Sequence, residues 1–163
     1  MRHLIDSVRA AVVNRNWYAA LSMALSLPDV CAKLEDPTQD GSQRRYAGWF
    51  DRNLAATYQR TVGEATHTFL SGPDCYALRC AFSHAGDFNI SEQLARHVLD
   101  AFVFVAVNPG SLIRMNHMNG RLQLQVDLFC EEICEAVERW LAGAGASPEV
   151  QARIAALPQV LMW

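Results

Sequence analysis

Apolar residues recur every three or four positions along most of the chain, and this spacing constrains the fold more than any other feature of the sequence. It is the period of an α-helix that buries one face. The pattern predicts helices over residues 3–14, 17–35, 44–61, 74–84, 91–99, 127–142 and 150–157. Pro28 lies inside the second of these, where it predicts a kink or a restart near residues 26–27. The sequence therefore predicts a mainly α-helical bundle.

One region departs from the helical pattern. Residues 102–107 are mostly β-branched or aromatic, which predicts a short strand. The dipeptide Asn119-Gly120 lies between two short runs of apolar residues and is typical of a tight β-hairpin turn. We therefore expect a small antiparallel β-hairpin or three-stranded sheet at about 102–126.

Length and hydropathy predict where the chain resides. The 163 residues suit one domain, so we expect a single helical domain that carries the hairpin as an insertion. The most apolar run, residues 101–107, is far shorter than the roughly 20 residues of a membrane span. The first residues include Asp6 and lack an apolar signal core. These features predict a soluble, cytoplasmic protein without a membrane partner.

Arginine dominates the basic residues. Lys33 is the only lysine among the 14 basic side chains, and the formal net charge is −3. This net charge does not indicate nucleic-acid binding by bulk electrostatics. Arginine suits bidentate phosphate contacts, although a general preference for arginine over lysine would give the same composition. A local basic patch would come from Arg44, Arg45, Arg52 and Arg60.

The five cysteines show no metal-binding spacing. None lies in a Cys-x-x-Cys pair, and Cys130 and Cys134 share one helical face. An odd number of cysteines in a cytoplasmic chain predicts free thiols that pack as small hydrophobic side chains. Because no histidine or acidic partner completes a ligand set by local spacing, we expect neither a metal ion nor another cofactor.

The strongest candidates for chemistry, Arg79 and His84, lie in the helix predicted over residues 74–84. Ser71 can cap this helix and Gly86 can stop it. Most of its other residues are apolar, so Arg79 needs a partner or a cavity, because burying an unpaired charge is costly. Five positions on a helix separate two side chains by about 140° around the axis. Both groups can still reach one cleft, or they can belong to a buried hydrogen-bond network.

The segment Leu78-Arg79-Cys80-Ala81-Phe82-Ser83-His84-Ala85-Gly86 resembles the signature of the HEPN superfamily, an arginine followed after four to six residues by a histidine. The resemblance covers this short segment and its helical setting. It implies a helical-bundle homodimer in which two copies of the motif face each other. Many members of the superfamily are metal-independent endoribonucleases, and the resemblance points to a toxin–antitoxin or phage-defence setting.

In such an enzyme the 2′-hydroxyl group of RNA attacks the adjacent phosphate. The resemblance assigns proton transfer to His84 and phosphate binding to Arg79. Tyr76, Cys80 and Ser83 would bind or orient the substrate or the imidazole. Many active members carry Asn, Asp or His in place of Cys80, so the alternative is a non-catalytic HEPN-like module that binds nucleic acid or a protein partner. A helical interaction protein outside the superfamily is the third hypothesis.

The remaining histidines and the aromatic residues favour structural roles. We expect His67 to be structural or exposed, His97 to lie on an exposed helix face and His117 to be a solvated strand residue. The aromatic residues at positions 17–58 could stack on bases, but their helical spacing favours packing in the core.

Overall fold

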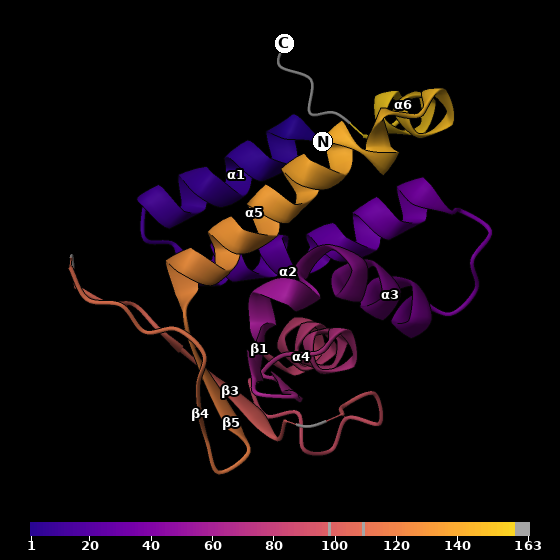
Figure 1. The fold of residues 1–163 in the computed structure, drawn as a ribbon. Helices are drawn as coiled ribbons and strands as arrows, with labels where there is room; N and C mark the ends of the chain where they lie inside the picture. Colours follow the sequence, from indigo (N-terminus) through magenta and orange to yellow (C-terminus); the bar gives the residue numbers. More distant parts are fainter. Residues whose placement is uncertain (98, 109, 159–163) are drawn as a thin grey trace.

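Helix α2 (Trp17–Glu35) lies at the centre of the structure. The computed structural model describes residues 1–97, 99–108 and 110–158. Because α2 is apolar around most of its circumference, burial on several sides is favoured. It contacts α1 (Arg2–Val13), α3 (Ser42–Leu54), α4 (Gly72–Ala85), α5 (Val126–Ala142) and α6 (Pro148–Ala155). The described chain is mainly helical, as its sequence predicts (Figure 1).

Two details of the helices differ from the expectations. α2 continues through Pro28 as one helix, so the predicted restart near residues 26–27 is wrong. A proline removes only one backbone hydrogen bond, and the packing of α2 on all sides outweighs that loss. α5 begins at Val126, one residue before the predicted start, with Gln125 in the capping position and Asp127 in the first turn.

Three strands form the predicted small sheet, in the order β3-β5-β4. They are β3 (Ala101–Val105), β4 (Asn116–Met118) and β5 (Arg121–Gln125). β4 and β5 pair antiparallel, and Asn119 and Gly120 turn between them with φ angles of 52° and 72°. The hairpin and the three-stranded sheet are confirmed. The sheet is mixed, because β3 pairs with β5 in parallel.

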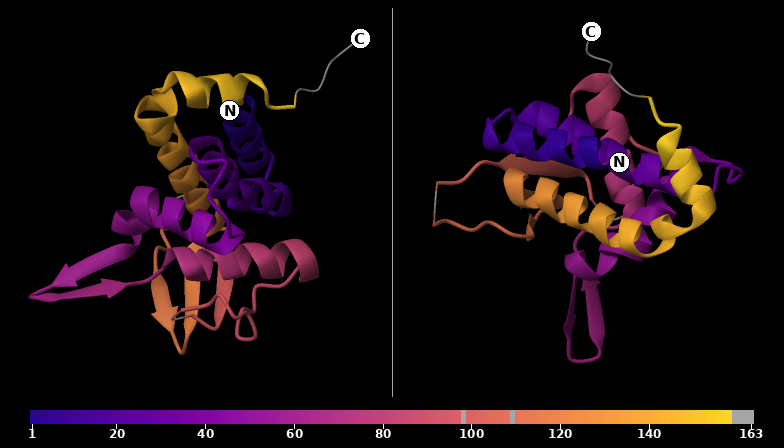
Figure 2. Two further views of the ribbon diagram at one scale, coloured as in Figure 1. Left: turned by 90° about the vertical axis from the view of Figure 1, so that its right-hand side faces the viewer. Right: turned by 90° about the horizontal axis from the view of Figure 1, so that it is seen from above.

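A second β-hairpin replaces the end of a predicted helix. α3 ends at Leu54, and a 3-10 turn (Ala55–Tyr58) leads into β1 (Gln59–Val62), which pairs antiparallel with β2 (Ala65–Thr68). The prediction of a helix as far as residue 61 is therefore wrong beyond Leu54. Threonines on both strands have β-branched side chains that favour extended backbone. Figure 2 shows this hairpin projecting away from the helices.

Residues 91–97 form turns and irregular structure, so the helix predicted over 91–99 is wrong. The buried Asp74 carboxylate in α4 accepts hydrogen bonds from the backbone amides of His97 (2.7 Å) and Leu99 (3.3 Å). The backbone amide of Ile90 donates to the Asp100 carbonyl oxygen over 2.8 Å. These bonds use amide groups that a helix would need, and they fix the segment against the start of α4.

One hydrophobic cluster includes side chains from all six named helices and from β3 and β5. Its largest fully buried side chains include Trp49, Tyr46, Tyr58 and Phe50, so the predicted core role of these aromatic residues is confirmed. The expectation is wrong for Tyr18, which is 70% exposed. All five cysteines are free, and all except Cys80 are buried, as predicted. Among the described helices, none combines the length and apolar character that crossing a membrane requires.

Candidate functional site

Helix α4 carries all the predicted site residues, and a capping residue defines each of its ends. The Asp74 amide donates to Ser71 Oγ over 3.2 Å, and the Ser71 hydroxyl donates to the Asp74 carboxylate over 2.6 Å. Gly86 ends the helix in the left-handed conformation with a φ angle of 64°. The cap and the stop expected from the sequence are therefore both confirmed.

The start of α4 packs against α3 at backbone distance. A Cβ atom built on Gly72 would lie 2.4 Å from the Ala47 carbonyl oxygen, a distance that leaves no room for a side chain. The Gly72 amide also donates to Asp51 Oδ1 over 2.7 Å. Glycine is required at this position for a close approach of two helices. The contact sets the position of α4, and hence of Arg79, relative to α3.

The predicted site residues share the side of α4 that faces away from the core. Beyond Gly72, the side of α4 that faces the core consists of its buried residues, Asp74, Cys75, Ala77, Leu78 and Ala81. A helix turns by about 100° per residue, so the predicted site residues fall on the opposite side within an arc of about 140°. We call this set the outer face of α4; in order around the axis it consists of Arg79, Ser83, Tyr76, Cys80 and His84.

Arg79 lies at one edge of the outer face and is paired with an acid from another helix. Its Nη2 atom lies 3.6 Å from Oδ2 of Asp29 in α2, and the Arg79 side chain remains 27% exposed. The other carboxylate oxygen of Asp29 accepts hydrogen bonds from Nη2 (3.1 Å) and Nε (3.3 Å) of Arg45 in α3. One carboxylate is therefore shared by two guanidinium groups, and Arg79 is held at the surface rather than sealed in the core.

The surroundings of this ion pair are rich in positive charge. Asp29 and Arg45 line an open hollow of about 340 Å³ together with Lys33. Lys33 lies one turn after Asp29 on α2, and its ammonium group donates to the Pro37 carbonyl oxygen over 2.5 Å. Three cations and one carboxylate thus lie where α2, α3 and α4 meet. Such an arrangement can bind an anionic group, because the single acid cannot neutralise all three cations.

Tyr76 points toward α3. Its hydroxyl oxygen lies 2.8 Å from Ser42 Oγ, and its ring packs edge-on against Tyr46 with 5.5 Å between the ring centroids. Tyr46 is fully buried, its hydroxyl oxygen lies 3.4 Å from Cys75 Sγ, and burial raises the pKa of this phenol well above its ordinary value. Tyr76 therefore joins α4 to α3 and supports the geometry around Arg79.

His84 lies at the other edge of the outer face, in the last turn of α4. Its side chain is exposed and forms no hydrogen bond or ion pair with the described part of the chain. A cationic imidazole would interact favourably with this end of the helix dipole. Ser83 beside it is exposed as well, and Cys80 is half-buried. The imidazole is thus free to contact a substrate or a second chain.

Within one chain the structure does not join Arg79 to His84. No hydrogen bond or ion pair between described residues connects them, and about 7.5 Å of helix axis separates their Cα positions. They face directions that differ by about 140°. A substrate would have to wrap around α4 to meet both groups of one chain. Two chains that meet along their outer faces would bring an arginine and a histidine together without that difficulty.

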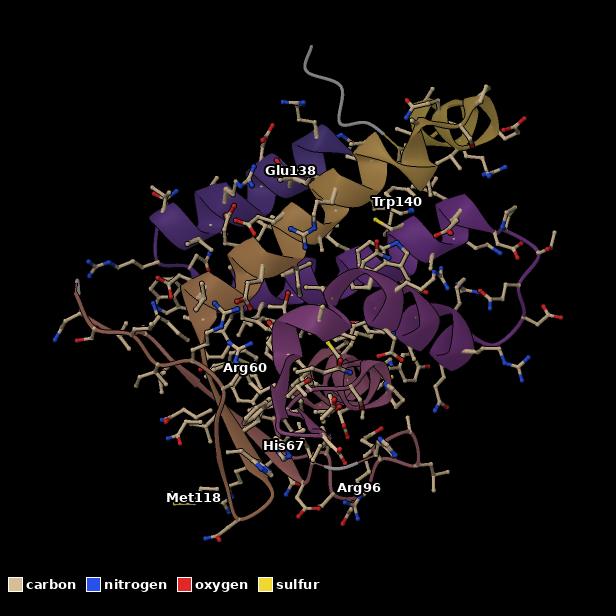
Figure 3. The ribbon with its side chains drawn as sticks, viewed as in Figure 1. Arg60, His67, Arg96, Met118, Glu138 and Trp140 are labelled. Carbon is tan, nitrogen blue, oxygen red and sulfur yellow. The ribbon has the colours of Figure 1, made fainter. Side chains whose placement is uncertain are left out.

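The predicted basic patch is dispersed. Arg45 pairs with Asp29, Arg52 lies 3.2 Å from Glu35, and Arg60 lies on the projecting β1–β2 hairpin, where Figure 3 labels it. Arg44 lines a separate groove beside Pro73. Only Arg45 joins the site on α4. Asp29 belongs to no motif in the sequence; its one signal is that a charged residue inside the apolar α2 helix needs a partner.

The other histidines lie outside this site. His67 and His117 are exposed, as expected, and their ring centroids are 6.2 Å apart. His97 is exposed but lies in irregular structure rather than on a helix. Among the described residues, no group of three or more histidine, cysteine or acidic side chains is arranged to hold a metal ion.

Comparison with protein-family models, curated protein sequences and solved structures found no match to this chain.

Proposed function

We propose that the chain is a HEPN-like endoribonuclease that acts in the cytoplasm as a homodimer and cleaves RNA with Arg79 and His84. One observation carries the proposal: Arg79, His84 and their three companions together form the outer face of α4, which the core leaves accessible. Neither functional group is buried among apolar side chains. A toxin or phage-defence role would follow from cleavage of cellular or invading RNA, and it rests on the resemblance alone.

The proposed reaction uses a nucleophile that the substrate itself supplies. The 2′-hydroxyl group of one nucleotide attacks the adjacent phosphorus, and the bond to the 5′-oxygen of the next nucleotide breaks. The products are a 2′,3′-cyclic phosphate and a free 5′-hydroxyl group. His84 accepts the hydroxyl proton or protonates the leaving oxygen, because an imidazole exchanges protons near neutral pH. This chemistry does not require a metal ion as a participant.

Arg79 binds the phosphate oxygens and stabilises the negative charge that grows on them in the transition state. Asp29 restrains the guanidinium group from one side, and Arg45 neutralises part of the Asp29 charge, so a phosphate does not meet an unpaired carboxylate. Ser83 and Cys80 lie between Arg79 and His84 on the outer face and would contact the ribose or the phosphate. Tyr76 acts as a positioning residue through its contact with Ser42.

A second candidate, a non-catalytic HEPN-like module that binds nucleic acid or a protein partner, is favoured by a specific observation. Arg79 is already engaged by Asp29, and within one chain it faces away from His84. Cys80 replaces the polar residue that many active relatives carry next to this arginine. Such a module would bind RNA or a protein through the same outer face without cleaving it.

Cleavage of end-labelled RNA in the presence of EDTA separates the two candidates. The nuclease proposal expects the wild-type protein to cleave and the Arg79→Ala and His84→Ala variants each to lose about 100-fold or more in rate. Arg139→Ala and His97→Ala, which remove exposed side chains of the same types elsewhere, are the matched controls and should cleave normally. RNA binding without cleavage by the wild-type protein would support the binding module. Equal residual cleavage in all variants would indicate a contaminating nuclease and contradict the proposal.

A further inference from the structure

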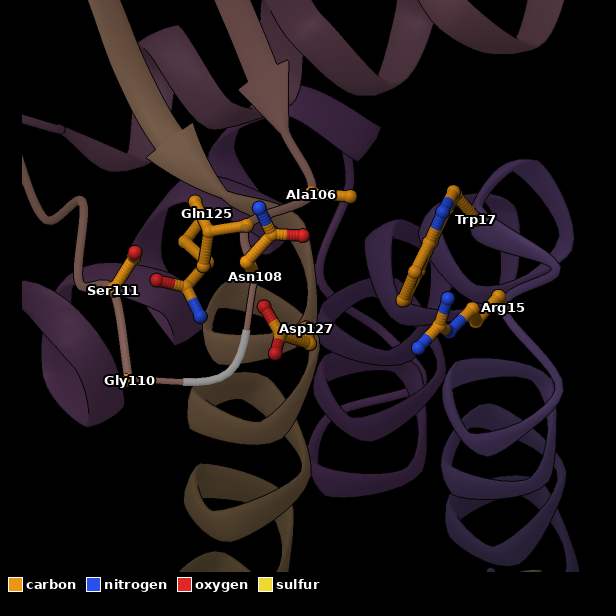
Figure 4. A pocket seen from close by; sticks show the side chains of 9 residues that line it. Arg15, Trp17, Ala106, Asn108, Gly110, Ser111, Gln125 and Asp127 are labelled. Atoms are coloured by element: carbon orange, nitrogen blue, oxygen red, sulfur yellow. The ribbon is translucent and has the colours of Figure 1, made fainter.

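A second site, away from the outer face of α4, is a cavity of about 500 Å³ (Figure 4). Arg15, in the turn after α1, and Trp17, the first residue of α2, lie on one side of it. Asn108, from the segment after β3, lies on the other side with Gln125 and Asp127 at the start of α5. The cavity therefore offers an aromatic wall, a cation, a carboxylate and two amide side chains to one ligand.

The Asp127 carboxylate is the most informative group in the cavity. Its Oδ1 atom is buried and accepts no hydrogen bond from any described residue. Buried carboxylate oxygens normally have partners, because an unsatisfied acceptor costs free energy. Arg15 lines the same cavity but forms no ion pair with Asp127 or any other described acid. The Asp127 side chain lines the cavity and is half-buried, so a turn of the carboxylate about its Cβ–Cγ bond would bring Oδ1 to a ligand that donates hydrogen bonds.

One wall of the cavity, at Gln125, is held by a contact within the chain. Gln125 Oε1 accepts a hydrogen bond from the Ile113 amide over 3.2 Å, which leaves its amide N–H groups available to donate. In the same segment, Arg114 forms an ion pair with Glu132 of α5, with 2.5 Å between Nη2 and Oε1. Arg15 adopts a left-handed backbone conformation, with a φ angle of 55°, that a non-glycine residue rarely adopts.

These groups match one class of ligand, and we propose that the cavity binds a guanine nucleotide. A carboxylate only accepts hydrogen bonds, and guanine presents two adjacent donors, N1–H and the N2 amino group. Adenine and cytosine place an acceptor nitrogen beside their amino group, and uracil flanks its single N–H donor with two carbonyl oxygens. The indole of Trp17 provides a stacking surface for the base. The amide groups of Gln125 and Asn108 can donate to the guanine acceptors.

The charges also orient the ligand. The start of a helix usually attracts phosphate, but here Asp127 places a negative charge in the first turn of α5. A phosphate is therefore repelled from that end of the cavity and attracted to the Arg15 guanidinium on the other side. The base would lie at Asp127 and the phosphate at Arg15.

The guanine nucleotide could be free or could belong to an RNA chain. Aromatic side chains connect the cavity to α4: Tyr18, next to Trp17, is 70% exposed and stacks on Phe82 of α4 with 6.4 Å between ring centroids and an interplanar angle of 10°. Phe82 lies within two positions of His84. An RNA strand could follow these rings from the cavity to the outer face of α4. This second source rests on the proposed ribonuclease function, whereas binding of the free nucleotide does not.

Isothermal titration calorimetry with nucleoside monophosphates tests the site. The wild-type protein should bind GMP at least about tenfold more tightly than AMP, CMP or UMP. Asp127→Asn should weaken GMP binding by at least about tenfold, whereas Asp6→Asn, which removes an exposed acid from α1, should not change it. Arg15→Gly suits the left-handed backbone and should remove the advantage of GMP over guanosine.

A second titration distinguishes the two sources. The His84→Ala variant, which should not cleave RNA, is titrated with a short oligouridine that carries one guanosine and with the same oligomer carrying adenosine. Tighter binding of the guanosine oligomer than of GMP assigns the site to RNA, and equal or weaker binding assigns it to a free nucleotide. Failure of the wild-type protein to bind GMP, equal affinity for GMP and AMP, or unchanged GMP binding by Asp127→Asn would overturn the proposal. Absence of RNA cleavage would contradict only the ribonuclease function.

Discussion

Oδ2 of Asp29 lies 3.6 Å from Nη2 of Arg79, and this ion pair joins the central helix α2 to the outer face of α4. Both side chains keep about a quarter of their surface exposed. An ion pair of this kind contributes roughly 1 kcal/mol or less to stability, so a phosphate can compete for the guanidinium group. The pair therefore restrains Arg79 without withdrawing it from a ligand.

Replacing Asp29 should affect turnover more than RNA binding. Asp29→Asn keeps the shape of the side chain but removes the charge that positions Arg79, while all three nearby cations remain. We expect kcat for RNA cleavage to fall by about tenfold or more and KM to stay unchanged or to decrease. Steady-state kinetics with labelled RNA measures both constants, with Asp6→Asn as the control for removing an exposed acid. An unchanged kcat, or a rise in KM alone, would show that Asp29 does not position Arg79.

The close contact of α3 and α4 gives a prediction of stability with an internal control. Gly72→Ala would place a Cβ atom 2.4 Å from the Ala47 carbonyl oxygen, so the two helices must separate. We expect the free energy of unfolding to fall by about 1–3 kcal/mol. Gly48→Ala, within α3, would meet only the end of the flexible Arg52 side chain at 3.4 Å and should stabilise the protein by about 0.4–1 kcal/mol. Urea denaturation distinguishes the two, and equal effects would refute this account of the contact.

Glu132 should make stability depend on pH. Its carboxyl group is buried between Tyr58, which donates a hydrogen bond to it, and Arg114. Burial raises the pKa of Glu132 above its ordinary value of 4.5, because the charged form loses hydration; the contacts with Tyr58 and Arg114 oppose this shift. The folded chain therefore binds this proton more tightly than the unfolded chain. Its contribution to the free energy of unfolding is fully present below pH 4.5 and is lost as pH rises through the raised pKa.

Glu132→Gln removes this titration while keeping a hydrogen-bonding side chain. The stability of the wild-type protein relative to Glu132→Gln should decrease as pH rises from below 4.5 toward neutrality. Urea denaturation across that range measures the difference, and Glu135→Gln, an exposed acid on the same helix, controls for the loss of a surface charge. A relative stability that grows with pH would mean that the Arg114 ion pair outweighs burial.

Short-range sequence signals predict most of the helices and the face of α4 that carries the candidate site residues. Ser71, Gly86 and Asn119-Gly120 each act within a few residues, so their roles follow from sequence alone. The placement of all five candidate residues on one side of α4 also follows from helical geometry. The buried residues of that helix are apolar apart from Asp74, which is hydrogen-bonded to the capping residue Ser71.

Contacts between distant segments were not predictable in the same way. The parallel pairing of β3 with β5 and the sharing of Asp29 by Arg45 and Arg79 depend on how helices pack, and no short-range pattern encodes them. Residues 91–97 carry a helical pattern of apolar residues. The Asp74 carboxylate nevertheless accepts a hydrogen bond from the backbone amide of His97, at the end of that segment. The sequence does not predict the β1–β2 hairpin, because its side chains are largely exposed and show no alternation of apolar and polar residues.

Mixing two inactive variants tests the central claim most directly, namely that the outer faces of two α4 helices together form one RNA-cleaving site. Arg79→Ala and His84→Ala chains are unfolded together, refolded as a mixture and assayed on labelled RNA with EDTA present. The account predicts that the mixture regains a clear fraction of wild-type cleavage that neither variant shows alone, because a mixed dimer contains one intact arginine opposite one intact histidine. A mixture that stays as inactive as its two components would contradict it.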